Sequence, residues 1–304
     1  MKSSVSNQVN NFKKKGIIEF NNIFQKEKCI NLYNQLTKDR EWGPSLFRSQ
    51  KDVILNPQYK KTNPGKGINN LAEKFNLDFV EKNEIIINTL NFILGIDFEI
   101  ILKKFVVAAP SHWIPSWLKG KIASSLAANL GPYIKEEFRD VSYFRGIDYH
   151  MDQIDFPNSN PDFITMYVYL NDTTPEMSPL HVIEKSHIYG PTKFPHFINE
   201  VNEDYVIYGL DKNNSKKLKK KMLIGNAGTA YIWSCLTLHG TQPQVDKDIF
   251  RISLRYLIKK NKKNKKKFLI DKLLPTDKKV LKTRDDIELK THEQKQKKFI
   301  KILK

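Results

Sequence analysis

The first half of the chain shows hydrophobic patterns of helices and of isolated strands. Residues 16–20 form a short apolar run that predicts a buried strand, and residues 25–36 place apolar side chains at a spacing of three to four. That spacing is typical of an amphipathic helix. Residues 70–94 repeat the helical spacing with a break near Asn76, and residues 98–109 predict a strand.

The pattern changes after residue 132 to short apolar or alternating runs separated by turn-forming residues. Several short strands at this spacing predict an antiparallel sandwich or jelly roll, with the helices of the first half packed on one sheet. The expected class is therefore α+β, mainly β. Residues 187–222 lack clear periodicity and are expected to form an insertion between strands. The predicted strands are 138–144, 149–152, 163–170, 181–183, 229–233 and 250–258.

One predicted strand alternates two kinds of side chain. Thr165, Tyr167 and Tyr169 occupy every second position, and apolar residues stand between them. Alternate positions face opposite sides of a sheet, so one set lines the interior of the sandwich or barrel. The sequence leaves open which set that is.

Composition narrows the class of protein. The 304 residues suit one large domain or two small ones, and a hydrophobic content of 40% is sufficient for a full core. The chain contains no run of 18 apolar residues, so we expect no membrane span. Because the chain begins with polar residues, we expect no secretory signal. The two cysteines, Cys29 and Cys235, form neither a disulfide framework nor a zinc pattern. A cytoplasmic location is expected.

The positive charge is concentrated near the C-terminus. Residues 259–304 contain 18 Lys or Arg and 6 Asp or Glu, a large part of the net charge of +18. We expect a lysine-rich extension there and a polar, flexible arm at residues 1–15. The extension is either a solvated segment or an electrostatic handle for nucleic acid, anionic lipid or an acidic partner. Few aromatic side chains are present to stack on bases, which favours the solvated segment.

Candidate chemistry begins at His150-Met151-Asp152. On a strand, residues i and i+2 point to the same side, so an imidazole and a carboxylate can meet at one point. This pair is two thirds of the 2-His-1-carboxylate set that holds Fe(II) on one face. Such a short motif is common by chance, so the interpretation requires a second histidine.

His239 is the best candidate for that histidine. It follows the apolar run 231–238 and precedes a predicted turn, and Arg251 comes twelve residues later at the start of another strand. A hairpin with this loop length would bring Arg251 close to His239. His181 and His187 are expected to make structural hydrogen bonds. The histidines downstream of Asp152 are His181, His187, His196, His239 and His292.

Arg251 fits a further requirement of such a site. A 2-oxo acid can fill two open metal positions through its carboxylate and keto oxygen, and its far carboxylate then needs a cationic partner. A guanidinium binds a carboxylate through two parallel hydrogen bonds, which an ammonium cannot do. Thr241, two residues after His239, can donate a hydroxyl to the same carboxylate. Arg255 is expected to be a secondary charge or part of a structural ion pair.

The ordered set His150-x-Asp152, His239-x-Thr241 and Arg251 resembles the phytanoyl-CoA dioxygenase family of Fe(II)/2-oxoglutarate oxygenases. The resemblance extends over residues 16–258 and includes the stretches 16–36, 168–175, 178–180 and 186–187.

The resemblance implies a double-stranded β-helix and a dioxygenase domain at residues 16–258. It also implies Fe(II) held by His150, Asp152 and His239, with 2-oxoglutarate and O2 as co-substrates. The reaction would hydroxylate a small molecule and release succinate and CO2. Related iron halogenases have Gly or Ala at the position of Asp152, so the carboxylate favours hydroxylation or another oxidation over halogenation.

Two turns and one strand depart from the family pattern. The family usually has Asn-Gly at the positions of Met177-Ser178 and Gly at the position of Lys185. Many members also place a lysine on the strand before the metal motif, and Arg145 is the candidate to replace it as a cofactor-binding residue. The departures in the two turns bear on the shape of the loops rather than on metal binding.

Two other functions fit the sequence. One is a catalytically silent jelly-roll protein that binds a ligand or partner, and the other is a nucleic-acid-directed oxygenase that uses the basic tail. The segments expected to shape a substrate pocket are 40–70, 112–118 and 187–222. Their aromatic side chains, with Arg139 and Arg145, are compatible with an anionic or amphipathic small molecule but select none.

Overall fold

The computed structural model describes residues 2–38, 40–56, 70–123, 127–156, 160–192, 196–241 and 250–273. The helices are α1 (Lys2–Lys15), α2 (Lys26–Lys38), α3 (Gln50–Leu55), α4 (Asp78–Glu81), α5 (Glu84–Leu94), α6 (Ser116–Ala123) and α7 (Leu269–Leu273). The strands are β1 (Ile17–Phe20), β2 (Glu99–Ala108), β3 (Ala127–Asn129), β4 (Ser142–His150), β5 (Phe163–Tyr169), β6 (Leu180–Ile183), β7 (Phe197–Glu200), β8 (Tyr205–Gly209), β9 (Ser215–Leu223), β10 (Ala230–Ser234), β11 (His239–Thr241) and β12 (Arg251–Lys259).

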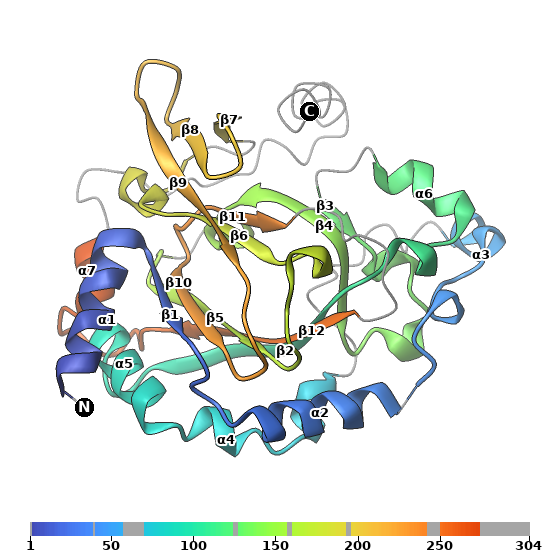
Figure 1. Ribbon diagram of the computed structural model, residues 1–304, viewed down its shortest axis with the longest axis horizontal. Helices are drawn as coiled ribbons and strands as arrows, with labels where there is room; N and C mark the ends of the chain where they lie inside the picture. Colours follow the sequence, from blue (N-terminus) through green and yellow to red (C-terminus); the bar gives the residue numbers. More distant parts are fainter. Residues whose placement is uncertain are drawn as a thin grey trace.

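The strands form two facing walls. One wall has the order β1-β10-β5-β12-β2 and the other β4-β11-β6-β9, with β2 and β4 joined in parallel (Figure 1). From β4 onward, the chain passes back and forth between the walls, so that β5, β10 and β12 lie in one and β4, β6, β9 and β11 in the other. This interleaving is the double-stranded β-helix, a jelly-roll arrangement. The predicted fold class is confirmed.

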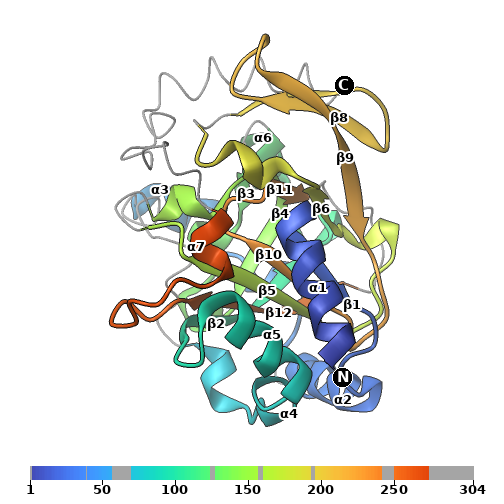
Figure 2. The same cartoon turned by 90° about the vertical axis from the view of Figure 1, so that its left-hand side faces the viewer.

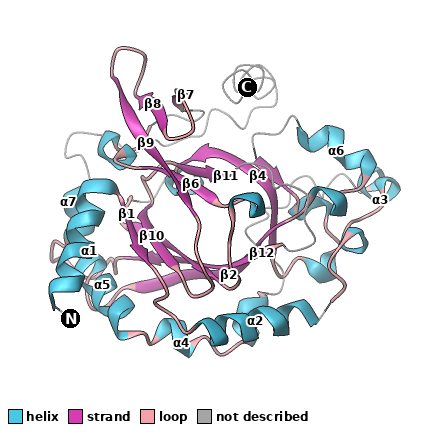
Figure 3. Ribbon diagram, viewed as in Figure 1, coloured by secondary structure: helices cyan, strands magenta, loops and turns pink. Residues whose placement is uncertain are grey.

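Helices cover the outer face of the first wall. Figure 3 shows α2, α4 and α5 on one side of the central strands. Ile164, Met166 and Val168 of β5 belong to the apolar core formed with these helices, whereas Tyr167 and Tyr169 belong to a separate cluster with Trp233 of β10. The alternation left open by the sequence is thereby resolved, because the Thr165, Tyr167 and Tyr169 set faces the barrel interior.

Both ends of the chain differ from expectation. Residues 1–15, predicted to be a flexible arm, contain helix α1, whose Phe12 side chain is fully buried in the main core. The other described side chains of α1 are exposed or half-buried, so an average over composition does not reveal this one buried aromatic side chain. The folded domain was also predicted to end at residue 258. Instead, β12 ends at Lys259 and Ile270 of α7 is fully buried, so the folded part extends further.

The rest of the tail, residues 274–304, lies outside the described residues. Within the described part of the chain, no helix combines the length and apolar character needed to cross a membrane.

The predicted insertion at residues 187–222 contains regular strands. β7, β8 and β9 form an antiparallel ribbon that projects away from α2 and α4 (Figure 2), and β9 also pairs with β6. Five lysines in β9 obscure its alternation. One of them, Lys220, is nevertheless buried and forms an ion pair with Glu200 of β7 at 3.1 Å. Lysine stems can cover apolar surface while their ammonium groups find a partner, so hydropathy alone misses such strands.

The two turns that depart from the family pattern keep a left-handed backbone conformation. Ser178 and Lys185 have φ angles of 52° and 68°, which lie in the left-handed region. Glycine adopts this conformation without steric cost, whereas other residues do so at some cost. The resemblance placed glycine at these two positions, and the backbone keeps the conformation that glycine favours.

Candidate metal centre

Three potential ligands converge inside the barrel. His150 ends β4 and His239 begins β11, and the two residues are direct cross-strand partners with ring centroids 4.3 Å apart. Asp152 follows at the start of the 3-10 turn η7 (Asp152–Asp155). One ligand atom from each residue lies within 4.8 Å of the other two. The His-x-Asp spacing predicted both residues on one strand, whereas in the structure His150 ends β4 and a turn brings the Asp152 carboxylate to the same point.

The carboxylate of Asp152 accepts hydrogen bonds from three side chains. Its Oδ2 accepts hydrogen bonds from Thr165 Oγ1 at 2.5 Å and Trp233 Nε1 at 3.3 Å, and its Oδ1 accepts one from Arg255 Nη2 at 2.5 Å. The residue is only 1% exposed. These contacts hold the plane of the carboxylate in one orientation.

The charge state of Asp152 follows from these neighbours. Burial alone raises the pKa of Asp152, but the positive charge of Arg255 lowers it, as do His239, His150 and the hydrogen bond from Thr165. The net result is a pKa well below the ordinary value. Asp152 is therefore an anion at neutral pH, as a metal ligand must be.

His239 presents a single free nitrogen to the centre. Its Nδ1 lies 2.9 Å from the carbonyl oxygen of Thr237, so we assign the ring proton to Nδ1. Nε2 then carries a lone pair and lies 3.7 Å from Asp152 Oδ2. Burial lowers the pKa of His239 to about 4, which keeps the imidazole neutral. A backbone acceptor on the distal nitrogen is the usual way to orient a metal-binding histidine.

These features fit a non-haem iron site. Two imidazoles and one ionised carboxylate, contributed from one side, form the donor set preferred by Fe(II) with open positions opposite. Ca²⁺ and Mg²⁺ favour sites made of oxygen alone, whereas two imidazoles and one carboxylate suit Fe(II) and also catalytic Zn²⁺. Among the described residues, His150, Asp152 and His239 form the group of this kind that could hold a metal ion.

Arg251 lies on the same strand as Arg255, four positions earlier. It is 3% exposed, and its Nη1 donates to Ser253 Oγ at 2.6 Å while Nη2 donates to the carbonyl of Ser178 at 3.2 Å. The guanidinium lies over the Tyr169 ring. Its Nε is buried and has no hydrogen-bond partner among the described residues. A buried cation with an open donor favours an anionic ligand such as a carboxylate.

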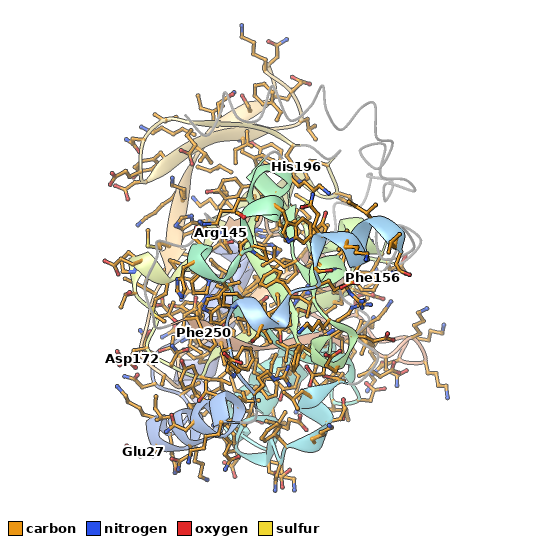
Figure 4. All side chains as sticks on the ribbon, turned by 90° about the vertical axis from the view of Figure 1, so that its right-hand side faces the viewer. Glu27, Arg145, Phe156, Asp172, His196 and Phe250 are labelled. Atoms are coloured by element: carbon orange, nitrogen blue, oxygen red, sulfur yellow. The ribbon has the colours of Figure 1, made fainter. Side chains whose placement is uncertain are left out.

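The other two predicted cofactor-binding residues lie on the second wall, which contains β4 and β11. Thr241 shares β11 with His239 and is two positions away, which places both side chains on one side of the strand. Arg145 lies on β4 and donates a hydrogen bond to Ser111 Oγ. Figure 4 labels Arg145 above Phe250 on one side of the molecule. The roles of Thr241 and Arg145 as cofactor-binding residues stay predictions.

Several contributors were missed from the sequence. Thr165 and Trp233 come from β5 and β10, and both donate to Asp152. Ser253 extends the polar side of β12 next to Arg251. The alternation of Thr165 with apolar residues was a weak signal. Arg255, expected as a secondary charge or ion pair, forms an ion pair with Asp152 itself.

Comparisons with known proteins give limited similarity. No family model matches the chain, and no curated protein matches it. One similar solved structure is that of the non-heme alpha ketoglutarate dependent epimerase SnoN from nogalamycin biosynthesis. It shows 12% identity and a TM-score of 0.48 and covers 85% of this chain and 83% of that chain.

A second structure is SnoN in complex with Fe3+, alpha ketoglutarate and nogalamycin RO, with 10% identity, a TM-score of 0.48, and coverage of 85% and 84%. At these values neither similarity determines fold or function, so the fold assignment depends on the strand order. The resemblance to the phytanoyl-CoA dioxygenase family stays a prediction.

Proposed function

We propose that the protein is an Fe(II)/2-oxoglutarate-dependent dioxygenase that hydroxylates a small molecule. The observation that carries the proposal is the convergence of His150, Asp152 and His239 within 4.8 Å inside a jelly-roll barrel. Fe(II), 2-oxoglutarate and O2 would supply the oxidising chemistry, with release of succinate and CO2. The resemblance of the ordered motifs to phytanoyl-CoA dioxygenases supports the same assignment.

The residues around the centre have separable roles in this proposal. His150, Asp152 and His239 would hold the metal, while Thr165, Trp233 and Arg255 fix the carboxylate before the metal arrives. Preorganised ligands lose little freedom when they bind, which favours affinity. Thr237 keeps the proton on Nδ1 of His239, so that Nε2 remains available.

Arg251 would bind the far carboxylate of 2-oxoglutarate. Its open Nε and the adjacent Ser253 hydroxyl offer donors, and the ring of Tyr169 supports the guanidinium. A buried guanidinium can pair with a carboxylate through parallel hydrogen bonds and thereby fix its orientation. Thr241 is proposed to donate its hydroxyl to the same group.

Anaerobic titration tests the proposal. Addition of Fe(II) and then 2-oxoglutarate should produce a visible charge-transfer absorption band in the wild-type protein, and admission of O2 should yield succinate. Asp152→Ala should show neither. Asp78→Ala removes an exposed carboxylate of α4 and is the matched control, which should behave as wild type.

A catalytically silent binding protein gives a different result. It would show no band and no succinate under any condition, although it could still bind a ligand. Wild-type rates of succinate formation in Asp152→Ala would also contradict the assignment.

A further inference from the structure

Arg139 is a further buried cation and lies just before β4. Arg139 follows the 3-10 turn η6 (Glu136–Phe138) and is 7% exposed. Its Nε and Nη2 are buried and have no hydrogen-bond partner among the described residues. These two nitrogens share one edge of the planar guanidinium, which is the edge that grips a carboxylate, sulfate or phosphate through two hydrogen bonds.

The surroundings of Arg139 are positive rather than compensating. Burial lowers the pKa of Arg139 first, and the charge of Arg48 lowers it further, against an opposing contribution from Glu136. The nearby Asp140 is already engaged, because both of its oxygens accept hydrogen bonds from Arg40 at 2.7 and 2.8 Å. The local carboxylate therefore does not neutralise Arg139.

Lys104 connects this region to the metal centre. It is the direct cross-strand partner of Arg255, which donates to Asp152. Opposite residues of an antiparallel pair project from the same face, so Lys104 lies on the interior side of β2. The pKa of Lys104 is lowered to about 8, first by burial and then by Arg139, against an opposing contribution from Asp140 and with a smaller lowering by Arg255. Lys104 is therefore electrostatically coupled to both arginines.

We propose that Arg139, together with Lys104, binds an anionic group of the primary substrate. The inference rests on the proposed function and specifies the substrate as a small molecule with a phosphate, sulfate or carboxylate group. An isolated buried cation is costly, and a ligand that supplies the missing charge removes that cost. The group would be held separately from the 2-oxoglutarate carboxylate. Arg251 lies four residues from Arg255 on β12, about 13 Å along the strand.

Thermal unfolding of the metal-free protein tests anion binding without turnover. The probes are inorganic phosphate, sulfate and acetate at constant ionic strength in the presence of EDTA, with chloride as reference. At least one of the three should raise the wild-type Tm saturably, and the most effective anion indicates which group is recognised. Because no iron is needed, this measurement stands even if the protein fails to make succinate.

Arg139→Met separates a ligand site from a structural role. Removal of an uncompensated buried charge should raise Tm in chloride by about 2–4 °C and abolish the response to the effective anion. Arg139→Lys should retain a weakened response. Lys217→Met removes one exposed lysine of β9 and should respond as wild type. A lower Tm for Arg139→Met with an intact anion response would overturn the proposal, as would the absence of any saturable response in wild type.

Paired substrates then test the link to catalysis. Small molecules with a phosphate, sulfate or carboxylate should be compared with their neutral counterparts in a succinate-release screen of the iron-loaded protein. We expect the charged member of an active pair to have the lower KM, and Arg139→Met to raise that KM at least 10-fold. Succinate release that is stimulated equally by charged and neutral members would contradict this inference while leaving the dioxygenase assignment intact.

Discussion

Asp152 and Arg139 are both buried ionised groups, and their environments are opposite. Asp152 receives three hydrogen bonds, one of them from the guanidinium of Arg255. Arg139 has two buried nitrogens without partners in the described structure and has Arg48 as a like-charged neighbour. Satisfying a buried charge stabilises the fold, whereas leaving one unsatisfied reduces stability.

The two sites are suited to ligands of opposite charge. At the metal centre, protein donors fix a carboxylate so that one more cation can be added. At Arg139, the protein leaves a cation open, and an anion would complete the site. Stability is therefore expected to respond in opposite directions when each charged group is removed.

The largest effect is expected at Asp152. In the metal-free protein, Asp152→Ala removes the carboxylate that forms the ion pair with Arg255 and leaves the positive charge of the guanidinium without that counter-ion. Loss of one member of a buried ion pair typically costs about 3–5 kcal/mol, and the lower end is expected because Arg255 is partly exposed. Urea unfolding in EDTA measures the difference.

The double variant Asp152→Ala/Arg255→Met isolates the cause. Removal of both charges should recover more than half of the lost free energy of unfolding, because the guanidinium that lost its counter-ion is removed as well. Equal instability of the single and double variants would show that the ion pair does not account for the effect.

Lys104 gives the next largest effect, through pH. Its pKa is about 8 in the folded protein, and its ordinary value is 10.5. Between these values the unfolded chain binds more protons, so this residue makes stability rise with pH. The penalty is fully present below pH 8 and fades above it, with a total of at most about 3 kcal/mol.

A matched series measures this contribution. The free energy of unfolding of wild type relative to Lys104→Met should increase from pH 7.5 to pH 10. In an Arg139→Met background the increase should be smaller, because the pKa of Lys104 is then less depressed. A difference between wild type and Lys104→Met that is constant with pH would refute the assignment of this titration to Lys104.

Arg251 should influence 2-oxoglutarate binding by a smaller amount. Arg251→Lys keeps the charge but loses the planar pair of donors, which corresponds to roughly 1.5–3 kcal/mol and a 10- to 100-fold rise in KM for 2-oxoglutarate. Ser253→Ala should raise KM less, by about 2- to 10-fold, because a neutral hydroxyl is lost. Steady-state succinate release measures both values. An unchanged KM in Arg251→Lys would place the carboxylate site elsewhere.

The metal ligands could be predicted from the sequence, but the side chains that donate hydrogen bonds to Asp152 could not. The order of His150, Asp152, His239 and Arg251 carried the prediction, and the structure places the first three within reach of one ion. The donors Thr165 and Trp233 could not be predicted, because their contact with Asp152 depends on the registers of β5 and β10. Periodicity specifies which residues share a face but not which residue on the next strand is opposite.

Some helices and strands of the fold also could not be predicted from the sequence. The positions of β5, β6, β10 and β12 followed from alternation and turn residues, as did the jelly-roll class, whereas the two strands predicted at 138–144 and 149–152 overlap a single strand, β4. Helix α1 and strand β9 were missed because lysines and other polar residues dominate them. A buried Phe12 fixes the helix and a buried ion pair helps to fix the strand, and both are tertiary contacts that a local pattern does not contain.

The smallest expected effect concerns the turn before η9 (Ser186–Tyr189). Lys185 is exposed and adopts φ 68°, where its Cβ atom is sterically unfavourable. Lys185→Gly removes that strain but makes the unfolded chain more flexible, so the two effects partly cancel. A net gain of about 0.5–1 kcal/mol in the free energy of unfolding is expected. Lys185→Ala retains the Cβ atom and should give no gain in urea unfolding. Equal stability of the two variants would mean that loss of the lysine side chain, rather than relief of backbone strain, controls this turn.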